Sequence, residues 1–450
     1  MQCSGMWSPY VGLCPCEACP EVLPPLGFMP YLPALEACVL GVLVEDILEE
    51  IFERVVKSRI FRNRDILSPD YIPDRLPHRE NEIRKVASVL AQALKGSKPS
   101  NLFIYGLTGT GKTAVTLYVL RRLEAKARQL GVPVRFSYVN TRQRDTPYKV
   151  LADIASSIGV RVPFTGLSTA EVYARIVRGL SRMQGVLIVV LDEVDWLVRR
   201  RGDDLLYKLT RIGYELPPGA AKVSIVGITN DVRFVELLDA RVRSSLGEEE
   251  IVFPPYNAEQ LRDILWERAR EAFQPGAVDD SVISYCAALA AREHGDARRA
   301  LDLLRVAGEV AERENADKVT IEHVKKAWSQ LERDRVLEVV STLPLHARLV
   351  LLAAIASGAA NGYTTTGELY AAYRELASAV GVESVTQRRV SDIINELDML
   401  GILSARVVSR GRYGKTRIIT LAADRDTVLE ALRRDSRLSE LVENLQNPRG

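Results

Sequence analysis

Hydrophobic and polar positions follow two different periods along the middle of the chain. Four short runs rich in β-branched and aromatic residues predict strands, at residues 101–105, 134–139, 186–191 and 223–228. Apolar residues at helical spacing fill the segments between them, at residues 112–123, 148–158 and 169–181. Strands that alternate with helices predict a parallel sheet covered by helices on both faces.

The second half of the chain has a different pattern. After residue 257 only helical periods remain, at residues 259–272, 279–294, 297–313 and 321–331. This predicts a small all-α domain. Beyond residue 334, further helical stretches end near Leu400, and two strand-like runs follow at residues 403–409 and 416–421. Helices followed by a β-hairpin indicate a winged-helix module.

The start of the chain has the composition of a disordered leader. Residues 1–33 contain seven prolines and no regular apolar period. An amphipathic helix is predicted next, at residues 45–57. The alternative for the leader is a zinc site made by Cys14, Cys16, Cys19 and Cys38. The single residue between the first two of these cysteines is a tighter spacing than structural zinc sites use, which favours the disordered leader.

Composition and charge narrow the function classes without choosing among them. The 450 residues are 47% hydrophobic and 26% charged, which is ordinary for a globular protein. The net charge is only +2, so affinity for an anionic partner must come from local clusters of basic residues. No apolar run approaches the length of a membrane span, and no Lys or Arg precedes Arg54 to form a secretory signal. We therefore expect a cytoplasmic protein.

A phosphate-binding loop follows the first predicted strand at once. The pattern G-x-x-x-x-G-K-[ST] precedes a helix here, so successive backbone N–H groups can face inward as an anion nest. Lys112 is placed to reach the β and γ phosphates, and the Thr113 hydroxyl to bind magnesium. The predicted nucleotide-binding residues are Gly106, Leu107, Thr108, Gly109, Thr110, Gly111, Lys112 and Thr113.

Acidic residues follow the apolar strand at residues 186–191. The carboxyl ends of parallel strands are where α/β sheets bind ligands. Asp192 is the predicted acid that holds magnesium, and Glu193 the predicted base that polarises a water for attack on the γ-phosphate. Asp195 is better explained as a helix cap or a surface acid.

Two more residues are candidates for a role in hydrolysis. Asn230 follows the fourth strand and can orient the attacking water, although in isolation it would indicate an Asx turn. Arg298 begins a helix of the all-α domain, and its guanidinium can reach the γ-phosphate. The alternative for Arg298 is a surface ion pair with Asp302, four residues further along the helix.

With these four motifs in order, the chain resembles AAA+ ATPases of the initiator group. It closely resembles the archaeal homologues of the origin recognition complex and the cell-division-control helicase loader. The resemblance covers roughly residues 57–425 and includes the stretches at 69–80, 146–152, 162–168 and 386–391. It implies an α/β AAA+ P-loop domain with a parallel sheet, a small all-α lid and a C-terminal winged-helix domain. It also implies ATP or ADP and Mg²⁺ as cofactors.

The resemblance assigns roles to individual residues. Residues 106–113 match Walker A, Asp192 and Glu193 match Walker B, and Asn230 and Arg298 match sensors one and two. It implies that the adenine lies near Leu76, His78 and Arg79, and that an initiator-specific insert at residues 146–167 touches DNA. Arg241 matches the arginine finger that completes a neighbouring subunit's site, with Arg243 as the alternative.

We expect five segments along the chain. They are a leader at 1–45, the AAA+ P-loop base at 46–256, the lid at 257–334, the winged helix at 335–425, and a C-terminal helix and tail at 426–450.

The predicted DNA-binding surface lies in the winged helix. The amphipathic stretch at residues 385–400 turns its apolar side chains inward, which are Val390, Ile393, Ile394, Leu397 and Leu400. Its first residues, Gln387, Arg388 and Arg389, are placed to contact bases. The hairpin adds five cations and no acid: Arg406, Arg410, Arg412, Lys415 and Arg417. Tyr413 at its tip can enter a minor groove, and the alternative is a solvated basic hairpin.

These features together predict a replication initiator. We expect it to bind double-stranded origin DNA and to help recruit or load the replicative minichromosome maintenance helicase, with slow ATP hydrolysis as a switch. Other copies or paralogues on DNA are expected partners, a membrane is not, and the protein should associate with the nucleoid. The alternative is a winged-helix transcription regulator or signalling ATPase. A protein-remodelling motor would need an aromatic pore loop, and the sequence offers no candidate.

Overall fold

The structure is a computed structural model. It describes residues 58–446 except for residues 70, 164, 232, 247, 359–361 and 410–414. The predicted leader, its alternative zinc site and the predicted helix at residues 45–57 lie outside the described residues. Within the described part of the chain, none of the helices combines the length and the hydropathy that crossing a bilayer requires.

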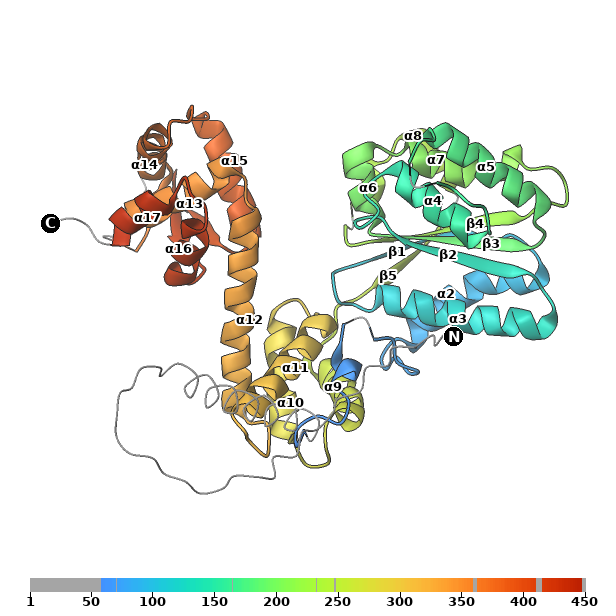
Figure 1. The fold of residues 1–450 in the computed structure, drawn as a ribbon, viewed down its shortest axis with the longest axis horizontal. Coiled ribbons are helices and arrows are strands. Elements are labelled where there is room, and N and C mark those ends of the chain that lie inside the picture. Colours follow the sequence, from blue (N-terminus) through green and yellow to red (C-terminus); the bar gives the residue numbers. More distant parts are fainter. Residues whose placement is uncertain are drawn as a thin grey trace, which may run out of the picture. The chain divides into compact units, whose positions relative to one another are not determined.

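A five-stranded parallel sheet forms the base domain (Figure 1). Its strands are β1 (Asn101–Gly106), β2 (Val134–Asn140), β3 (Val186–Asp192), β4 (Lys222–Thr229) and β5 (Glu248–Phe253). Their spatial order is β2-β3-β4-β1-β5, and every neighbouring pair is parallel, as predicted. Because β4 lies between β1 and β3, the ends of these three strands bring the phosphate loop, the acids and Asn230 to one edge of the sheet.

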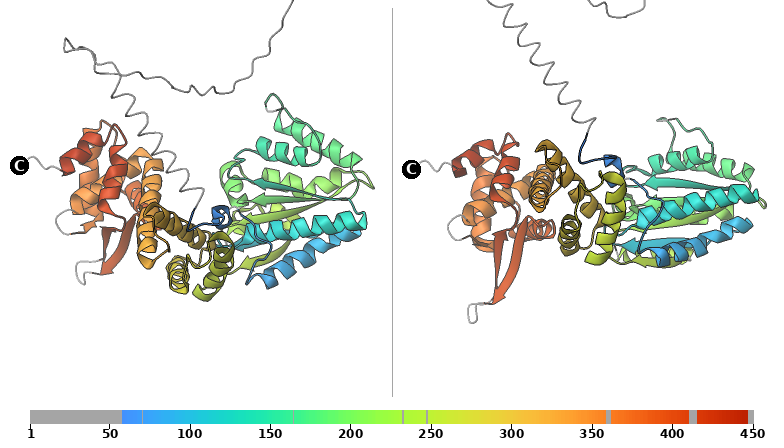
Figure 2. Two further views of the ribbon diagram at one scale, coloured as in Figure 1. Left: turned by 60° about the horizontal axis from the view of Figure 1, so that its bottom comes forward. Right: turned by 90° about the horizontal axis from the view of Figure 1, so that it is seen from below.

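Helices cover both faces of this sheet (Figure 2). One face carries α2 (Glu80–Leu90) and α3 (Lys112–Leu130). The other carries α4 (Pro147–Ser157), α5 (Thr169–Arg182), α6 (Val194–Arg201), α7 (Asp204–Arg211) and α8 (Ala240–Leu246). Every residue of β3 is therefore buried, which explains why its sequence is continuously apolar rather than alternating.

Four short 3-10 helices of the described chain lie between these elements or ahead of them. They are η1 (Arg64–Leu67), η2 (Ala91–Lys95), η3 (Ile212–Glu215) and η4 (Phe234–Leu237).

The sequence analysis missed strand β5. It begins with three glutamates, Glu248 to Glu250, a composition that is depleted in strands. The structure places β5 at the edge of the sheet, beside β1, where Glu249 and Glu250 are exposed. Ile251 and Phe253 are buried against the α2 and α3 side of the sheet. An edge strand tolerates such charged residues because part of its surface faces solvent.

The lid is the predicted all-α domain. Its helices are α9 (Ala258–Ala272), α10 (Asp280–Arg292), α11 (Ala297–Arg313) and the first half of α12 (Ile321–Thr342). Their apolar faces share one core, which includes Leu265, Ile283 and Leu304. The chain ahead of the base domain joins this core, since Phe61 stacks on Phe273 with 4.9 Å between ring centroids.

Helix α12 is longer than the sequence analysis predicted. The prediction ended it at residue 331, and the structure continues it to Thr342. Val324 and Ala327 belong to the lid core, whereas Val336 and Val340 belong to the winged-helix core. A single helix therefore serves two cores, and the apolar pattern breaks where one core gives way to the other. The predicted domain boundary at 334 and 335 falls inside this helix.

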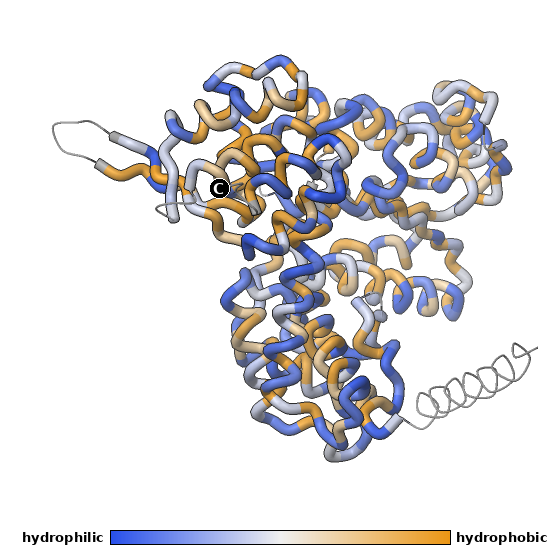
Figure 3. Tube along the Cα trace, turned by 60° about the vertical axis from the view of Figure 1, so that its left-hand side comes forward, coloured by the Kyte–Doolittle hydropathy of each residue, from blue (hydrophilic) through white to orange (hydrophobic). Residues whose placement is uncertain are grey.

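The winged helix follows with its own core. Its elements are α13 (Leu345–Gly358), β6 (Thr364–Thr365), α14 (Thr366–Ala379), α15 (Gln387–Met399), β7 (Leu403–Ser409), β8 (Lys415–Leu421), α16 (Arg425–Arg433) and α17 (Ser439–Gln446). The three strands form an antiparallel sheet in the order β6-β8-β7. Hydrophobic residues continue along the hairpin of β7 and β8, where Val407 is 66% exposed (Figure 3).

Helix α15 is the predicted recognition helix, and its inward face is largely as expected. Val390, Ile393, Ile394 and Leu397 are all buried. Leu400 was predicted to point inward, and this was wrong: it is 38% exposed. Leu400 is the C-cap residue of the helix, so no further turn of α15 covers its side chain.

Candidate functional site

The loop after β1 wraps around the ammonium of Lys112, the first residue of α3. Its Nζ donates to the carbonyls of Gly106 and Leu107 at 2.9 and 2.7 Å, and to Asn230 Oδ1 at 2.8 Å. Burial lowers the pKa of Lys112 to about 8, while the nearby Asp192 carboxylate acts in the opposite direction. The Lys112 ammonium is therefore partly desolvated, and a bound anion would stabilise its positive charge.

The backbone of the same loop has unused donors. Within the described chain, the N–H groups of Thr108, Gly109, Thr110 and Gly111 donate to no acceptor. Gly111 has a φ of +87°, a left-handed conformation that lets the backbone turn and that side chains resist. The loop lines a cavity of about 680 Å³. Inward N–H groups at a helix N-terminus form the kind of nest that binds phosphate.

The two predicted magnesium ligands lie together at the floor of this cavity. The Thr113 hydroxyl donates to Asp192 Oδ2 at 2.7 Å, and the Tyr138 hydroxyl donates to the same oxygen at 2.8 Å. Desolvation, followed by the charge of Asp192, raises the pKa of Tyr138, which keeps its phenol a donor. One carboxylate and one hydroxyl suit Mg²⁺, which takes its remaining ligands from water and phosphate. These residues fit the metal that the fold implies.

Glu193 lies beside this pair in a strained conformation. Its φ of +54° is left-handed, and it occupies the N-cap position of α6. Its carboxylate approaches the last residue of β2, Asn140, whose Nδ2 lies 3.5 Å away, and the Arg142 guanidinium just beyond the strand, at 3.8 Å. Asp195 accepts a hydrogen bond from the Thr229 hydroxyl at 2.8 Å, so it ties α6 to β4 and does not face the cavity.

The lid reaches the cavity from the opposite side. Arg298 lines it with an exposed side chain, and the Ala297 N–H donates to the Gly109 carbonyl at 3.2 Å. A Cβ on Gly109 would lie 1.7 Å from the Asp296 carboxylate, so only glycine allows this approach. The alternative role for Arg298, a surface ion pair with Asp302, is not what the structure has, because Asp302 pairs with Arg305 at 2.5 Å instead.

The three residues predicted beside the adenine have different surroundings. Leu76 lines the cavity. His78 does not, and its Nε2 lies 3.0 Å from Asp263 of the lid. Arg79 is only 1% exposed and lies beneath the loop, where Nε donates to the Thr110 carbonyl at 2.9 Å. Its guanidinium stacks 3.8 Å from the centroid of the Tyr256 ring. Arg79 therefore stabilises the conformation of the phosphate-binding loop from its buried side.

The two candidates for the arginine finger lie away from this cavity. Arg241 is on α8, its side chain is 81% exposed, and Nε donates to Asp239 at 3.2 Å. Arg243 is on the same helix and is also exposed. Neither lines the cavity of Lys112. An arginine on an outer helix suits contact with a second molecule.

Of the predicted DNA-binding residues whose side chains the structure describes, all but Arg417 are exposed. Gln387, Arg388 and Arg389 form the first turn of α15. Arg389 pairs with Glu396 of the same helix at 3.0 Å. On the hairpin, Arg406 of β7 is exposed and Arg417 of β8 is half-buried. The predicted residues Arg410, Arg412 and Tyr413, and the side chain of Lys415, lie outside the described residues.

Sequence reasoning missed two groups of cavity residues. Tyr138, Asn140 and Arg142 lie on β2 or just beyond it, and a signal was available: Tyr138 and Asn140 are two positions apart at the end of a strand. Tyr71 and Arg268 line the other end of the cavity. Arg268 Nη2 donates to the Tyr71 carbonyl at 3.2 Å, a contact between segments 197 residues apart that no local pattern could reveal.

The parallel sheet, the phosphate loop at its edge and the helical lid define an AAA+ ATPase with an appended winged helix. Matches to family models agree with this along the chain. An AAA domain matches residues 95–233, a Cdc6 AAA+ ATPase-type lid domain matches 262–329, and the CDC6 C-terminal winged helix domain matches 338–431.

The chain belongs to the ORC1/Cdc6 family of DNA replication initiators. ORC1-type DNA replication protein 1 of Sulfurisphaera tokodaii is 59% identical over 397 residues, which are 88% of this chain and 98% of that protein. The structure of the Aeropyrum pernix ORC1 protein in complex with DNA is 61% identical, with a TM-score of 0.76, and covers 86% of this chain and 100% of that one. The crystal structure of Cdc6p from Pyrobaculum aerophilum is 26% identical, with a TM-score of 0.53, and covers 86% and 99%.

Proposed function

We propose that this protein binds double-stranded origin DNA and, in a manner controlled by ATP, helps recruit or load the replicative minichromosome maintenance helicase. The observation that carries this proposal is that one helix, α12, joins the domain over the nucleotide cavity to the winged helix. Helix α12 belongs at its start to the lid that covers the nucleotide cavity, and at its end to the winged-helix core. A relative with 61% identity was solved in complex with DNA, which supports the DNA-binding part.

The nucleotide would bind with its phosphates at the loop after β1. The free N–H groups of residues 108–111 and the Lys112 ammonium would hold the phosphate oxygens. Thr113 and Asp192 would hold Mg²⁺, which neutralises charge on the β and γ phosphates when it is bound. Leu76, Tyr71 and Arg268 line the remainder of the cavity, where the base would lie.

We propose that hydrolysis is slow because Glu193 is restrained. Its carboxylate is the base that would take a proton from the attacking water, yet it faces Arg142 and Asn140 at 3.8 and 3.5 Å. Asn230, the predicted water-orienting group, accepts from Lys112. Arg241 lies outside the cavity, so the site is incomplete until a neighbour supplies its finger.

A line of polar contacts offers a route between the two sites. Arg298 lines the nucleotide cavity, and the next residue, Arg299, pairs with Glu332 of α12. One turn further along α12, Arg335 donates to the Leu400 carbonyl at 2.9 Å, at the end of the predicted recognition helix. Movement of Arg298 towards a γ-phosphate would shift Arg299 and, through these contacts, the end of the predicted recognition helix. Such a coupling supports a switch that links ATP binding to DNA binding.

Origin binding and promoter binding predict different positions of the protein along the chromosome in cells. Chromatin immunoprecipitation of the protein in its own organism should give a few strong sites that coincide with replication start sites mapped by marker frequency. Sites spread over many promoters would indicate a transcription regulator instead.

The helicase step needs a separate test. Purified helicase should be retained on an origin duplex by the wild-type protein with ATP and not with ADP. The Lys112→Ala variant is the control, since it should bind DNA and fail to respond to ATP. Equal retention with ATP, with ADP and with this variant would contradict the switch.

A further inference from the structure

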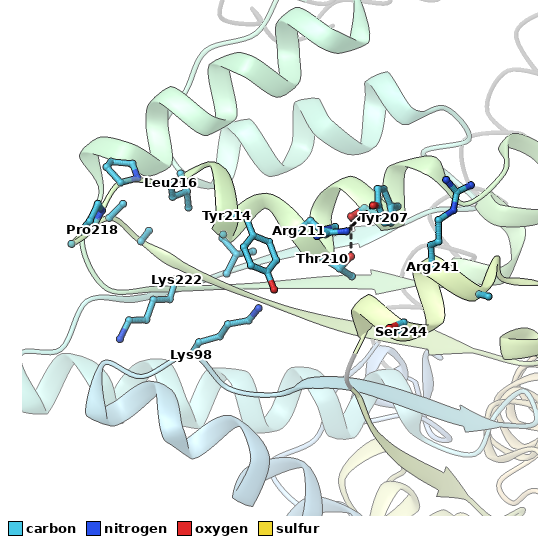
Figure 4. Close-up of a pocket in the computed structure, with 17 residues that line it drawn as sticks. Lys98, Tyr207, Thr210, Arg211, Tyr214, Leu216, Pro218, Lys222, Arg241 and Ser244 are labelled. Atoms are coloured by element: carbon cyan, nitrogen blue, oxygen red, sulfur yellow. Dashed lines mark hydrogen bonds between the residues drawn. The ribbon is translucent and has the colours of Figure 1, made fainter.

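The base domain has a second cavity, of about 960 Å³, that the nucleotide site does not use. It lies between the end of α7 with η3, the turn that leads into β4, and the start of α8 (Figure 4). Lys98, from the segment ahead of β1, closes one side. Among the described residues that line this cavity, none is an aspartate or a glutamate.

Three cations around the cavity have no carboxylate partner among the residues that the structure describes. Lys222 donates to the Gly96 carbonyl at 2.8 Å, and Arg211 donates to the Tyr207 hydroxyl at 2.8 Å, both of which are neutral acceptors. Lys98 has no hydrogen bond or ion pair with any residue that the structure describes. Desolvation lowers the pKa of Lys98, and a bound anion would act against that shift. The positive charge here is therefore available to an anionic ligand.

Aromatic rings lie between these cations. Tyr214 is 83% exposed, so its ring is open to solvent. The Arg211 guanidinium lies 5.2 Å from the centroid of Tyr214 and 5.4 Å from that of Tyr207. Figure 4 shows the order along the cavity: Lys222 and Lys98 at one end, then Tyr214, Arg211 and Tyr207, then Arg241 at the other end.

We propose that this cavity binds single-stranded DNA. Cations that alternate with aromatic rings suit an unpaired strand, because its phosphates are regularly spaced and its bases have free faces for stacking. A duplex would meet only the charges, since its bases are already stacked on one another. Lys98, Lys222 and Arg211 would hold phosphates, and Tyr214 would stack on a base. This inference goes beyond the proposed ATP switch and does not depend on it.

The test is binding of the full-length protein to a fluorescently labelled single strand of mixed sequence, measured by anisotropy at several salt concentrations. Tyr214→Ala should weaken binding roughly 5- to 100-fold, the loss expected for one stacked base. Tyr214→Phe should bind like the wild type because it keeps the ring. The Lys98→Gln, Lys222→Gln double variant should lower the salt slope by about 0.7 per lost phosphate contact.

Matched measurements separate this site from the others. Lys95→Gln removes a nearby exposed charge that does not line the cavity, and it should leave single-strand affinity unchanged. Affinity for an origin duplex should be unchanged in Tyr214→Ala, so a failed origin assay would not affect this result. Unchanged single-strand binding in both cavity variants would overturn the proposal. The proposal would also be overturned if an acidic peptide displaced the strand and its binding needed Lys98 and not Tyr214. That result would identify a protein partner instead.

Discussion

Lys112 illustrates how one residue can make the nucleotide affinity depend on pH. Its pKa is lowered to about 8 by burial, and only the protonated amine holds phosphate strongly. As pH rises through 8 the free protein loses this proton, so we expect ADP to bind roughly tenfold more weakly at pH 9 than at pH 7. Isothermal titration calorimetry should also detect proton uptake on binding at pH 8. Lys112→Arg keeps its charge throughout this range, so its affinity should not vary with pH. A constant wild-type affinity from pH 7 to 9 would contradict the assignment.

The two neighbouring acids should have separable roles. Glu193→Gln should retain ATP and Mg²⁺ but hydrolyse ATP roughly 10²- to 10⁴-fold more slowly, because an amide keeps the shape and cannot take a proton. Asp192→Asn should instead lose the Mg²⁺-dependent part of ATP binding, since Asp192 Oδ2 is the atom that faces Thr113. Equilibrium binding with and without Mg²⁺, combined with single-turnover hydrolysis, distinguishes the two. Identical behaviour of the two variants would show that the roles are assigned wrongly.

At the scale of elements, α15 and the hairpin should divide sequence preference from general affinity. Gln387, Arg388 and Arg389 lie exposed on the first turn of a helix, where side chains reach base edges. Replacing all three with alanine should therefore narrow the gap between origin and scrambled duplexes, by roughly 1 to 3 kcal/mol per lost bidentate contact.

The hairpin variant is the counterpart. Replacing Arg410, Arg412 and Lys415 with glutamine should weaken binding to both duplexes alike, and should flatten the salt dependence by about 0.9 per lost phosphate contact. Both variants should be titrated on both duplexes at several salt concentrations. If the hairpin variant alone loses discrimination, the division is the reverse of the one proposed here.

At the scale of the whole molecule, the position of the proposed arginine finger predicts cooperation between copies. Arg241 is exposed on α8 and does not line the cavity of its own chain, so its chemistry requires a second molecule. Lys112→Ala lacks a working site but keeps the finger, and Arg241→Ala has the opposite defect. Each alone should hydrolyse ATP poorly on origin DNA, and an equal mixture should recover part of the wild-type rate. Arg243→Ala is the control: if Arg243→Ala hydrolyses ATP poorly alone and recovers in the mixture, and Arg241→Ala does neither, Arg243 is the finger.

Local sequence determined most of the base domain and the phosphate site by itself. The period of two in the strands, the period of 3.6 in the helices and the spacing of Gly106, Gly111 and Lys112 are properties of short segments, and the structure has the predicted strands and helices there. The phosphate loop needed no distant information because its function depends on backbone N–H groups within eight residues. The matches to ORC1/Cdc6 family models confirm the family that these motifs predicted.

Tertiary structure alone decided the features that join distant segments. Strand β5 begins with three glutamates, and it forms because β1 offers it an edge to pair with. Helix α12 continues past its predicted end because a second core takes up its apolar residues. Tyr138 reaches Asp192 across the sheet, and Arg268 meets Tyr71 over 197 residues of chain. The physical reason is the same in each case: burial and pairing depend on what the fold brings alongside a segment, and the segment's own period carries no record of its neighbour.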